Sequence, residues 1–154
     1  MITLYELIES TQKKLEGIKV PGTVYCLADY THGRCHLFAQ ALQEECGYEM
    51  EFLWDEEYWF DDADEPLVVL VHAYCIVPNS NDDKEEYVDA RGSVSKLIIE
   101  REYECVSLLY DKSTLQQLKI EIEQGNFSEP EENEISSLRS FIKENKSLYY
   151  QPSL

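Results

Sequence analysis

Apolar residues follow helical spacing in two stretches near the start of the chain. Over 3–15, leucine and isoleucine fall on one face, and Thr3 with Glu6 can cap the first turn reciprocally, so we predict an amphipathic helix. Over 35–46, apolar side chains recur at i, i+3, i+4, i+7 and i+11, which predicts a second helix. Residues 20–34 have turn residues at both ends and no period, so we expect a loop that leads into this helix.

The middle of the chain predicts three strands that differ in burial. Residues 48–54 alternate between large apolar and acidic side chains, as in a strand with one buried side. After an acidic bend over 55–65, residues 66–77 are apolar on both faces and rich in β-branched side chains, which predicts a central strand. Turn residues at 78–83 precede an extended pattern at 86–89, so these two strands are predicted to pair as a hairpin.

The last third of the chain predicts shorter elements. Weaker patterns indicate a short segment that ends at Ile99 and a strand over 103–110. Ser113 is expected to cap a helix over 114–124, and a last helix is expected to begin at Ser128.

These elements fit one α+β domain in which helices pack on a small antiparallel sheet. A chain of 154 residues with 44% hydrophobic side chains is long enough and apolar enough to bury a single core. We expect this domain, with its additional C-terminal helices, over 1–146, followed by a flexible tail over 147–154.

The chain is strongly acidic, with 13 basic and 31 acidic residues and a formal net charge of −18 at pH 7. This charge repels nucleic acid and anionic lipid, so neither direct nucleic-acid binding nor a membrane partner is expected. A protein or peptide substrate of basic character fits the charge better. An acidic surface can also imitate a phosphate backbone, although acidity more commonly serves solubility.

Cysteine usage and the N-terminal residues favour a cytoplasmic protein without metal or cofactor. Five cysteines cannot all pair, and none forms a Cys-x-x-Cys motif. Neither a signal segment nor a run of 18 apolar residues is found. The acidic group Asp61–Asp64 lacks the central glycine and the closing glutamate of a calcium-binding loop, and no zinc-ligand set is complete.

Cys35 lies at the start of the second predicted helix, where unpaired N–H groups and the helix dipole lower the pKa of a thiol. The preceding Thr31–Arg34 supplies turn residues and a nearby guanidinium. These features are typical of a nucleophilic cysteine. A small core residue that begins an amphipathic helix would give the same local pattern.

A nucleophilic thiol needs a base, and the chain has three histidines. His36 should turn about 100° away from Cys35 on the helix, and nothing local orients His32 in its loop. His72 interrupts an otherwise apolar strand, where an imidazole is unfavourable unless it is hydrogen-bonded. His72 is therefore the candidate base, and the alternative is a structural histidine beside a turn aspartate.

Asp89 is the candidate partner of His72. The midpoint between the two positions falls within the turn after the central strand, so antiparallel pairing would place them directly opposite. Their Cβ atoms would then be about 5 Å apart. A carboxylate in that place can accept the Nδ1 proton of the ring and leave Nε2 facing Cys35.

The order of a cysteine helix, a histidine strand and an aspartate strand resembles the papain-like superfamily, including its transglutaminase-like and small bacterial amidase branches. The segments that carry the resemblance are Gly33–Leu42, Val71–Tyr74 and Tyr87–Gly92. They are similar to patterns in bacterial and phage domains of this kind, and the similarity covers about 31–95.

The resemblance implies a papain-like fold in which Cys35 is the nucleophile, His72 the general base and acid, and Asp89 the residue that orients the ring. It also implies a cysteine-dependent hydrolase or acyl transferase, which could be a peptidase, amidase, deamidase or transglutaminase, acting on an amide or thioester. The backbone N–H of Cys35 and a group near Tyr30 or Thr31 are the expected oxyanion donors.

A second hypothesis is an acidic interaction or inhibitor protein, such as a phage-derived nucleic-acid mimic, that binds a basic protein surface without catalysis. Residues 52–65 mix large aromatic side chains with carboxylates. This mixture suits a protein-binding surface or a lid beside the active cleft. Core aromatic side chains flanked by solvated acids would give the same pattern.

Overall fold

The computed structural model describes residues 3–62, 64–77, 86–102 and 108–150 of the chain. Its helices are α1 (Leu4–Glu16), the 3-10 helix η1 (Leu27–Tyr30), α2 (Cys35–Cys46), α3 (Lys96–Glu102), α4 (Leu115–Glu123), α5 (Glu134–Glu144) and α6 (Lys146–Tyr149). Its strands are β1 (Glu49–Tyr58), β2 (Leu67–Val77), β3 (Glu86–Asp89), β4 (Gly92–Val94) and β5 (Leu108–Ser113).

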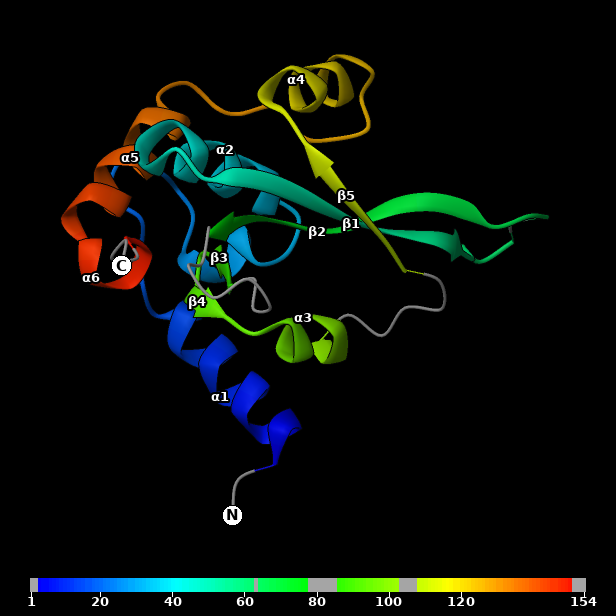
Figure 1. Cartoon of the computed structure of the whole chain (residues 1–154), viewed down its shortest axis with the longest axis horizontal. Helices are drawn as coiled ribbons and strands as arrows, with labels where there is room; N and C mark the ends of the chain where they lie inside the picture. The colour runs from blue at the N-terminus through cyan, green and yellow to red at the C-terminus, as the bar shows by residue number, and fades with distance from the viewer. Residues whose placement is uncertain (1–2, 63, 78–85, 103–107, 151–154) are drawn as a thin grey trace.

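The described strands form one antiparallel sheet in the order β4-β3-β2-β1-β5, with β2 at its centre. α2 packs on one face of the sheet and α5 packs on α2, whereas α3 contributes to the other face (Figure 1). The larger core gathers on the α2 face around Phe38, Leu42 and Phe52. A smaller core lies on the α3 face around Tyr74 and Ile99. The chain therefore has the expected α+β architecture.

Most of the N-terminal elements match the prediction. Thr3 and Glu6 make both bonds of a capping box, at 3.2 and 3.1 Å, and α2 has the predicted bounds. β1 runs on past its predicted end at Trp54 as far as Tyr58, because Asp55 and Tyr58 remain paired with β2. The strand predicted over 103–110 is present as β5 from Leu108 onward, and residues 103–107 lie outside the described part.

The C-terminal helices begin later than predicted. Thr114 rather than Ser113 caps α4, and its side chain accepts a backbone N–H at 3.1 Å. α5 begins at Glu134 rather than Ser128. Asn133 has a left-handed backbone with φ of 66°, which breaks the helical path just before α5.

The stretch after Lys146 starts with the short helix α6, although a loose tail was expected from residue 147. Tyr149 is fully buried in the main core. Its hydroxyl donates to the Ala90 carbonyl at 2.8 Å, and its ring lies 5.3 Å from that of Phe38. The buried ring and hydroxyl of Tyr149 therefore help to dock this segment against the sheet and α2. Residues 151–154 lie outside the described part.

β2 and β3 pair as a hairpin, as predicted, and the turn residues 78–83 lie outside the described part. The observed register, continued by one pair, aligns Asp89 with Tyr74 rather than with His72. The predicted register is therefore wrong by two residues. A shift of two keeps every side chain on its own face of the sheet, so Asp89 and His72 still share a face.

The docking of α6 can be tested with Tyr149→Phe. This variant loses the hydrogen bond to Ala90 and should lower the free energy of unfolding by about 1 kcal/mol, measured by urea denaturation. Tyr5→Phe is the matched control, because Tyr5 is 69% exposed and its variant should unfold like the wild type. Equal stability of all three proteins would contradict the docked position of Tyr149.

Candidate active site

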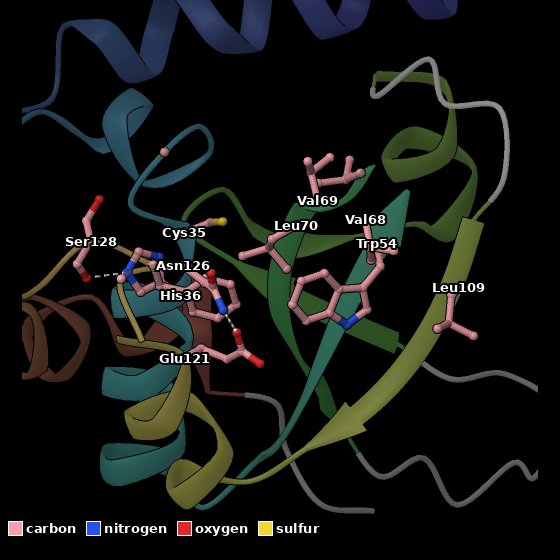
Figure 2. A pocket seen from close by; sticks show the side chains of 14 residues that line it. Cys35, His36, Trp54, Val68, Val69, Leu70, Leu109, Glu121, Asn126 and Ser128 are labelled. Carbon is pink, nitrogen blue, oxygen red and sulfur yellow. Dashed lines mark hydrogen bonds between the residues drawn. The ribbon is translucent and has the colours of Figure 1, made fainter. Parts of the chain in front are cut away.

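Cys35 borders a pocket of about 690 Å³ between the start of α2, β2 and the turn that follows α4 (Figure 2). The cysteine itself is only 4% exposed. Trp54, Leu70 and Phe127 line the same pocket. Its volume is within the range of about 300–1,000 Å³ that is usual for ligand pockets. The thiol is thus withdrawn from the surface but adjoins a space that can hold a ligand group.

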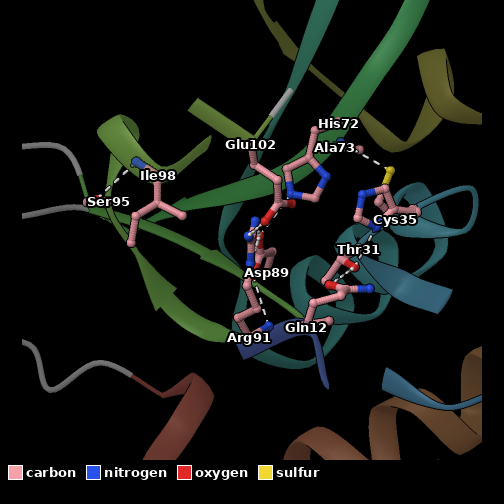
Figure 3. Close-up of polar contacts among 12 residues, drawn as sticks. Gln12, Thr31, Cys35, His72, Ala73, Asp89, Arg91, Ser95, Ile98 and Glu102 are labelled. Atoms are coloured by element: carbon pink, nitrogen blue, oxygen red, sulfur yellow. Dashed lines mark hydrogen bonds and ion pairs between the residues drawn. The ribbon is translucent and has the colours of Figure 1, made fainter. Parts of the chain in front are cut away.

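The sulfur of Cys35 lies at the edge of β2. The ladder between β2 and β3 covers Cys75–Val77, so the earlier residues of β2 extend beyond it. There the backbone N–H of Ala73 donates to the sulfur at 3.3 Å (Figure 3). From this edge, side chains on either face of β2 are within reach of the thiol.

His72 belongs to the face of the sheet opposite α2, where its ring lies 5.6 Å from that of Tyr74. A β-bulge in the pairing with β1 makes Val71 an extra residue of β2. The bulge turns Val71 to the face that His72 shares and leaves Leu70 facing the pocket. From its own face, the imidazole of His72 lies near enough to the Cys35 thiol for each group to shift the pKa of the other.

The structure brings His72 and Asp89 together, with Nε2 of the ring 2.8 Å from Oδ2 of the carboxylate (Figure 3). The ring orientation differs from the expectation, because Nε2 rather than Nδ1 faces Asp89. The register explains the difference: Asp89 is a diagonal neighbour and meets the far end of the ring. Nδ1 is then the ring nitrogen left for the thiol of Cys35.

Arg91 holds Asp89 from the other side. Its Nη2 donates to Oδ2 of Asp89 at 2.6 Å, and its Nη1 pairs with Glu102 of α3, also at 2.6 Å. The Arg91 side chain is 6% exposed, so it is committed to these two carboxylates rather than to a substrate. The contact links α3 to the site.

Burial disfavours the charged form of all three groups of the site, but their contacts with charged neighbours favour the charged form more strongly. Burial raises the pKa of Cys35, but hydrogen bonds with His36 and His72 lower it to about 6. Burial lowers the pKa of His72, but Asp89 and Cys35 raise it to about 9. Burial also raises the pKa of Asp89, whereas Arg91 and His72 hold it well below its usual range. Between about pH 6 and pH 9 the site therefore holds a thiolate, an imidazolium and a carboxylate.

His36 also contacts the thiol, and sequence reasoning missed it. Its Nε2 lies 2.8 Å from the carbonyl of Ser128, so this nitrogen is the donor and Nδ1 is free to face Cys35. Its ring packs 5.1 Å from that of Phe127. Helical side chains lean towards the helix start, so His36 reaches back to Cys35 despite the turn of about 100°. The signal that could have found it was its position next to the candidate nucleophile.

Arg34 is engaged away from the thiol that it was expected to activate. Its guanidinium forms a bidentate pair with the buried carboxylate of Glu134, with Nε to Oε2 at 2.9 Å. Tyr30 donates to the same carboxylate at 2.7 Å, and the guanidinium lies 4.3 Å above the ring of Tyr25. Arg34 therefore fastens the loop before Cys35 to the start of α5.

His32 lies on the same loop, and Thr31 orients it with Oγ1 2.9 Å from Nδ1. Burial lowers the pKa of His32, and the nearby charges of His72 and Arg91 act in the same direction, against that of Glu102. His32 is thus a neutral imidazole near the site at physiological pH, with a local partner that the sequence pattern did not indicate.

Comparison with known protein families, with curated proteins and with solved structures finds no match to this chain. Among the described residues, no group of three or more histidine, cysteine or acidic side chains is placed to hold a metal ion. The part of the chain that the structure describes has no helix of the length and apolarity needed to cross a membrane. The functional proposal therefore depends on the geometry of these side chains.

The lowered pKa of Cys35 predicts that iodoacetamide alkylates this thiol at a lower pH than it does an ordinary cysteine. Because the thiolate is the reactive form, the alkylation rate should rise through a midpoint near pH 6 rather than near the ordinary value of about 8.5. In His72→Ala the midpoint should move up by at least about one pH unit, since a hydrogen bond to the thiolate is lost. Site-resolved mass spectrometry measures both.

Cys46 is an internal control in the same digests, because burial and the charge of Glu45 raise its pKa to about 11. It should remain largely unlabelled at pH 7. Circular dichroism checks that His72→Ala is folded. A midpoint for Cys35 above pH 8 in the wild type, or the same midpoint in folded His72→Ala, would contradict the assigned thiolate–imidazolium pair.

Proposed function

We propose that this chain is a cysteine-dependent hydrolase or acyl transferase that acts on an amide or thioester carbonyl. The observation that carries the proposal is that Cys35, at the border of a pocket, is hydrogen-bonded by the backbone N–H next to His72, whose ring pairs with Asp89 at 2.8 Å. A thiol of low pKa beside an imidazole of raised pKa suits acyl transfer near neutral pH. The order of these elements along the chain also supports the papain-like resemblance.

In the first half-reaction, the thiolate of Cys35 attacks the carbonyl carbon and forms a C–S bond, while the carbonyl electron pair moves to oxygen. The backbone N–H of Cys35 is the proposed donor to this oxyanion. When the intermediate collapses, the bond to the leaving amine or thiol breaks, and the imidazolium of His72 gives its proton to that group. An acyl-cysteine and a neutral His72 remain.

In the second half-reaction, neutral His72 takes a proton from a water molecule, or from an acceptor amine, that attacks the acyl carbon. The C–S bond then breaks, the acid or new amide leaves, and thiolate and imidazolium are restored. Asp89 keeps the ring in place throughout and stays ionised, because Arg91 holds it as well. A reduced thiol is required at each turnover, so we propose a cytoplasmic location.

The proposal predicts turnover of an activated substrate panel made of acyl thioesters and peptide anilides that release a coloured product. Cys35→Ala should lower kcat/KM by at least about 1,000-fold, and Asp89→Asn by at least about 100-fold. The rate should be bell-shaped in pH, rising near pH 6 as the thiolate forms and falling near pH 9 as His72 loses its proton.

The matched control is Cys46→Ala, which removes a thiol outside the site and should retain the wild-type rate. Equal rates for the wild type and Cys35→Ala across the panel would refute the enzyme proposal. Loss of activity in the Cys46→Ala protein would refute the assignment of Cys35.

The end of the β1–β2 hairpin supports a second candidate function, binding of a basic protein surface. Figure 1 shows this end projecting beyond the neighbouring strands. Tyr58, Trp59 and Phe60 are 43%, 58% and 49% exposed there, and the exposed carboxylates of Glu56 and Glu57 precede them. Exposed aromatic side chains beside acids are common where proteins bind basic partners.

Calorimetry of the Cys35→Ala protein with a cationic amphipathic peptide tests the binding function without catalysis. Binding should weaken as salt screens the charges, and the double change Trp59→Ala and Phe60→Ala should reduce the affinity at least about fivefold. Tyr5→Ala, on exposed α1, is the control and should bind like its parent. Equal binding of an uncharged peptide of the same length would exclude this function.

A further inference from the structure

The pocket beside Cys35 combines apolar walls with a single acidic group. Trp54, Leu70 and Phe127 supply the apolar surface, and of the described residues that line the pocket Glu121 alone carries a carboxylate. Figure 2 shows Cys35, Leu70, Trp54 and Glu121 around the same opening. A ligand group that enters beside the thiolate therefore meets one carboxylate and otherwise mainly apolar side chains.

The carboxylate of Glu121 is held in place by neutral donors. Nδ2 of Asn126 donates to Oε2 at 2.8 Å, and Nε2 of Gln117 donates to Oε1 at 3.0 Å. Both donors are amides, so these contacts orient the carboxylate and leave its charge uncompensated. A half-buried carboxylate in this condition is a favourable partner for a cation that brings its own donors.

The walls suit the stem of a long basic side chain. The rings of Trp54 and Phe127 stack with centroids 5.8 Å apart and an interplanar angle of 29°. Lysine and arginine bury their methylene stems on apolar surface and keep the charged end at a polar group. An indole face also attracts a guanidinium or ammonium.

We propose that this pocket selects a substrate that carries a lysine or arginine side chain next to the reacting carbonyl, with Glu121 pairing with the cation and Trp54 and Leu70 contacting the stem. The inference rests on the proposed function, because it names the substrate class of the same site. It agrees with the net charge of −18, which favours basic substrates at long range.

Glu121 also has a structural role, which the test must separate from pairing with a cation. Its backbone carbonyl accepts the N–H groups of Asn126 at 2.9 Å and Phe127 at 3.3 Å. Glu121→Gln keeps this carbonyl and an amide oxygen for Asn126 but removes the charge. Glu123→Gln is the matched control, since it removes the same charge from an exposed position of α4 outside the pocket.

The first experiment compares alkylation of Cys35 by cationic 2-bromoethylamine and by neutral iodoacetamide, resolved by mass spectrometry. The ratio of the two rates isolates the charge preference of the pocket within each protein. It should fall about fivefold in Glu121→Gln and remain unchanged in Glu123→Gln. Equal ratios in the two variants would overturn the role of Glu121 while leaving the thiol chemistry intact.

The second experiment does not need a reactive thiol. The chain has two tryptophans, so Trp59→Phe in a Cys35→Ala background leaves Trp54 as the reporter. Nα-acetyl-arginine amide should change its fluorescence with at least about fivefold higher affinity than Nα-acetyl-norleucine amide, and adding Glu121→Gln should remove most of the difference.

The two experiments separate the failure of the pocket inference from the failure of the proposed function. A charge-selective response of Trp54 together with an inert Cys35 would retain the pocket inference and refute the enzyme. A reactive Cys35 with equal binding of both amides would refute the pocket inference alone.

Discussion

The hydrogen bond from the Ala73 N–H to the sulfur of Cys35 is the contact on which the site depends. It joins the first turn of α2 to the edge of β2, beyond the ladder with β3. Because His72 directly precedes Ala73, this backbone contact also brings the imidazole close to the thiol, although the ring and α2 belong to opposite faces. A longer ladder with β3 would occupy that N–H and separate the two groups.

Stability and reactivity share the same contacts in this site. Cys35, His72 and Asp89 are all buried, and an isolated charge in such a place would be unfavourable by several kcal/mol. Here the charges alternate in sign along a series of neighbours. The series runs from the thiolate of Cys35 through the imidazolium of His72, the carboxylate of Asp89 and the guanidinium of Arg91 to the carboxylate of Glu102. Loss of Arg91, for example, would remove an opposite charge from beside both Asp89 and Glu102.

Local sequence patterns were sufficient to predict α2 and β2. They also predicted that His72 and Asp89 meet, because an imidazole within an apolar strand and a short hairpin can both be recognised in the sequence. The register was wrong because it depends on pairing geometry that apolar and polar positions do not encode. The bulge at Val71 was missed for the same reason. His36 was missed because helical spacing gives the direction of a side chain but not how far it reaches back.

Pattern reasoning also could not find the residues that support the site, because they lie 59 to 100 residues downstream of the groups that they hold. Glu134 holds Arg34, Ser128 holds His36, and Tyr149 holds the turn after Asp89. The consequence concerns the newborn chain on the ribosome. Cys35, His72 and Asp89 emerge before the residues that hold them in place, so the complete set of contacts around the thiol can form only after residue 149 has left the exit tunnel.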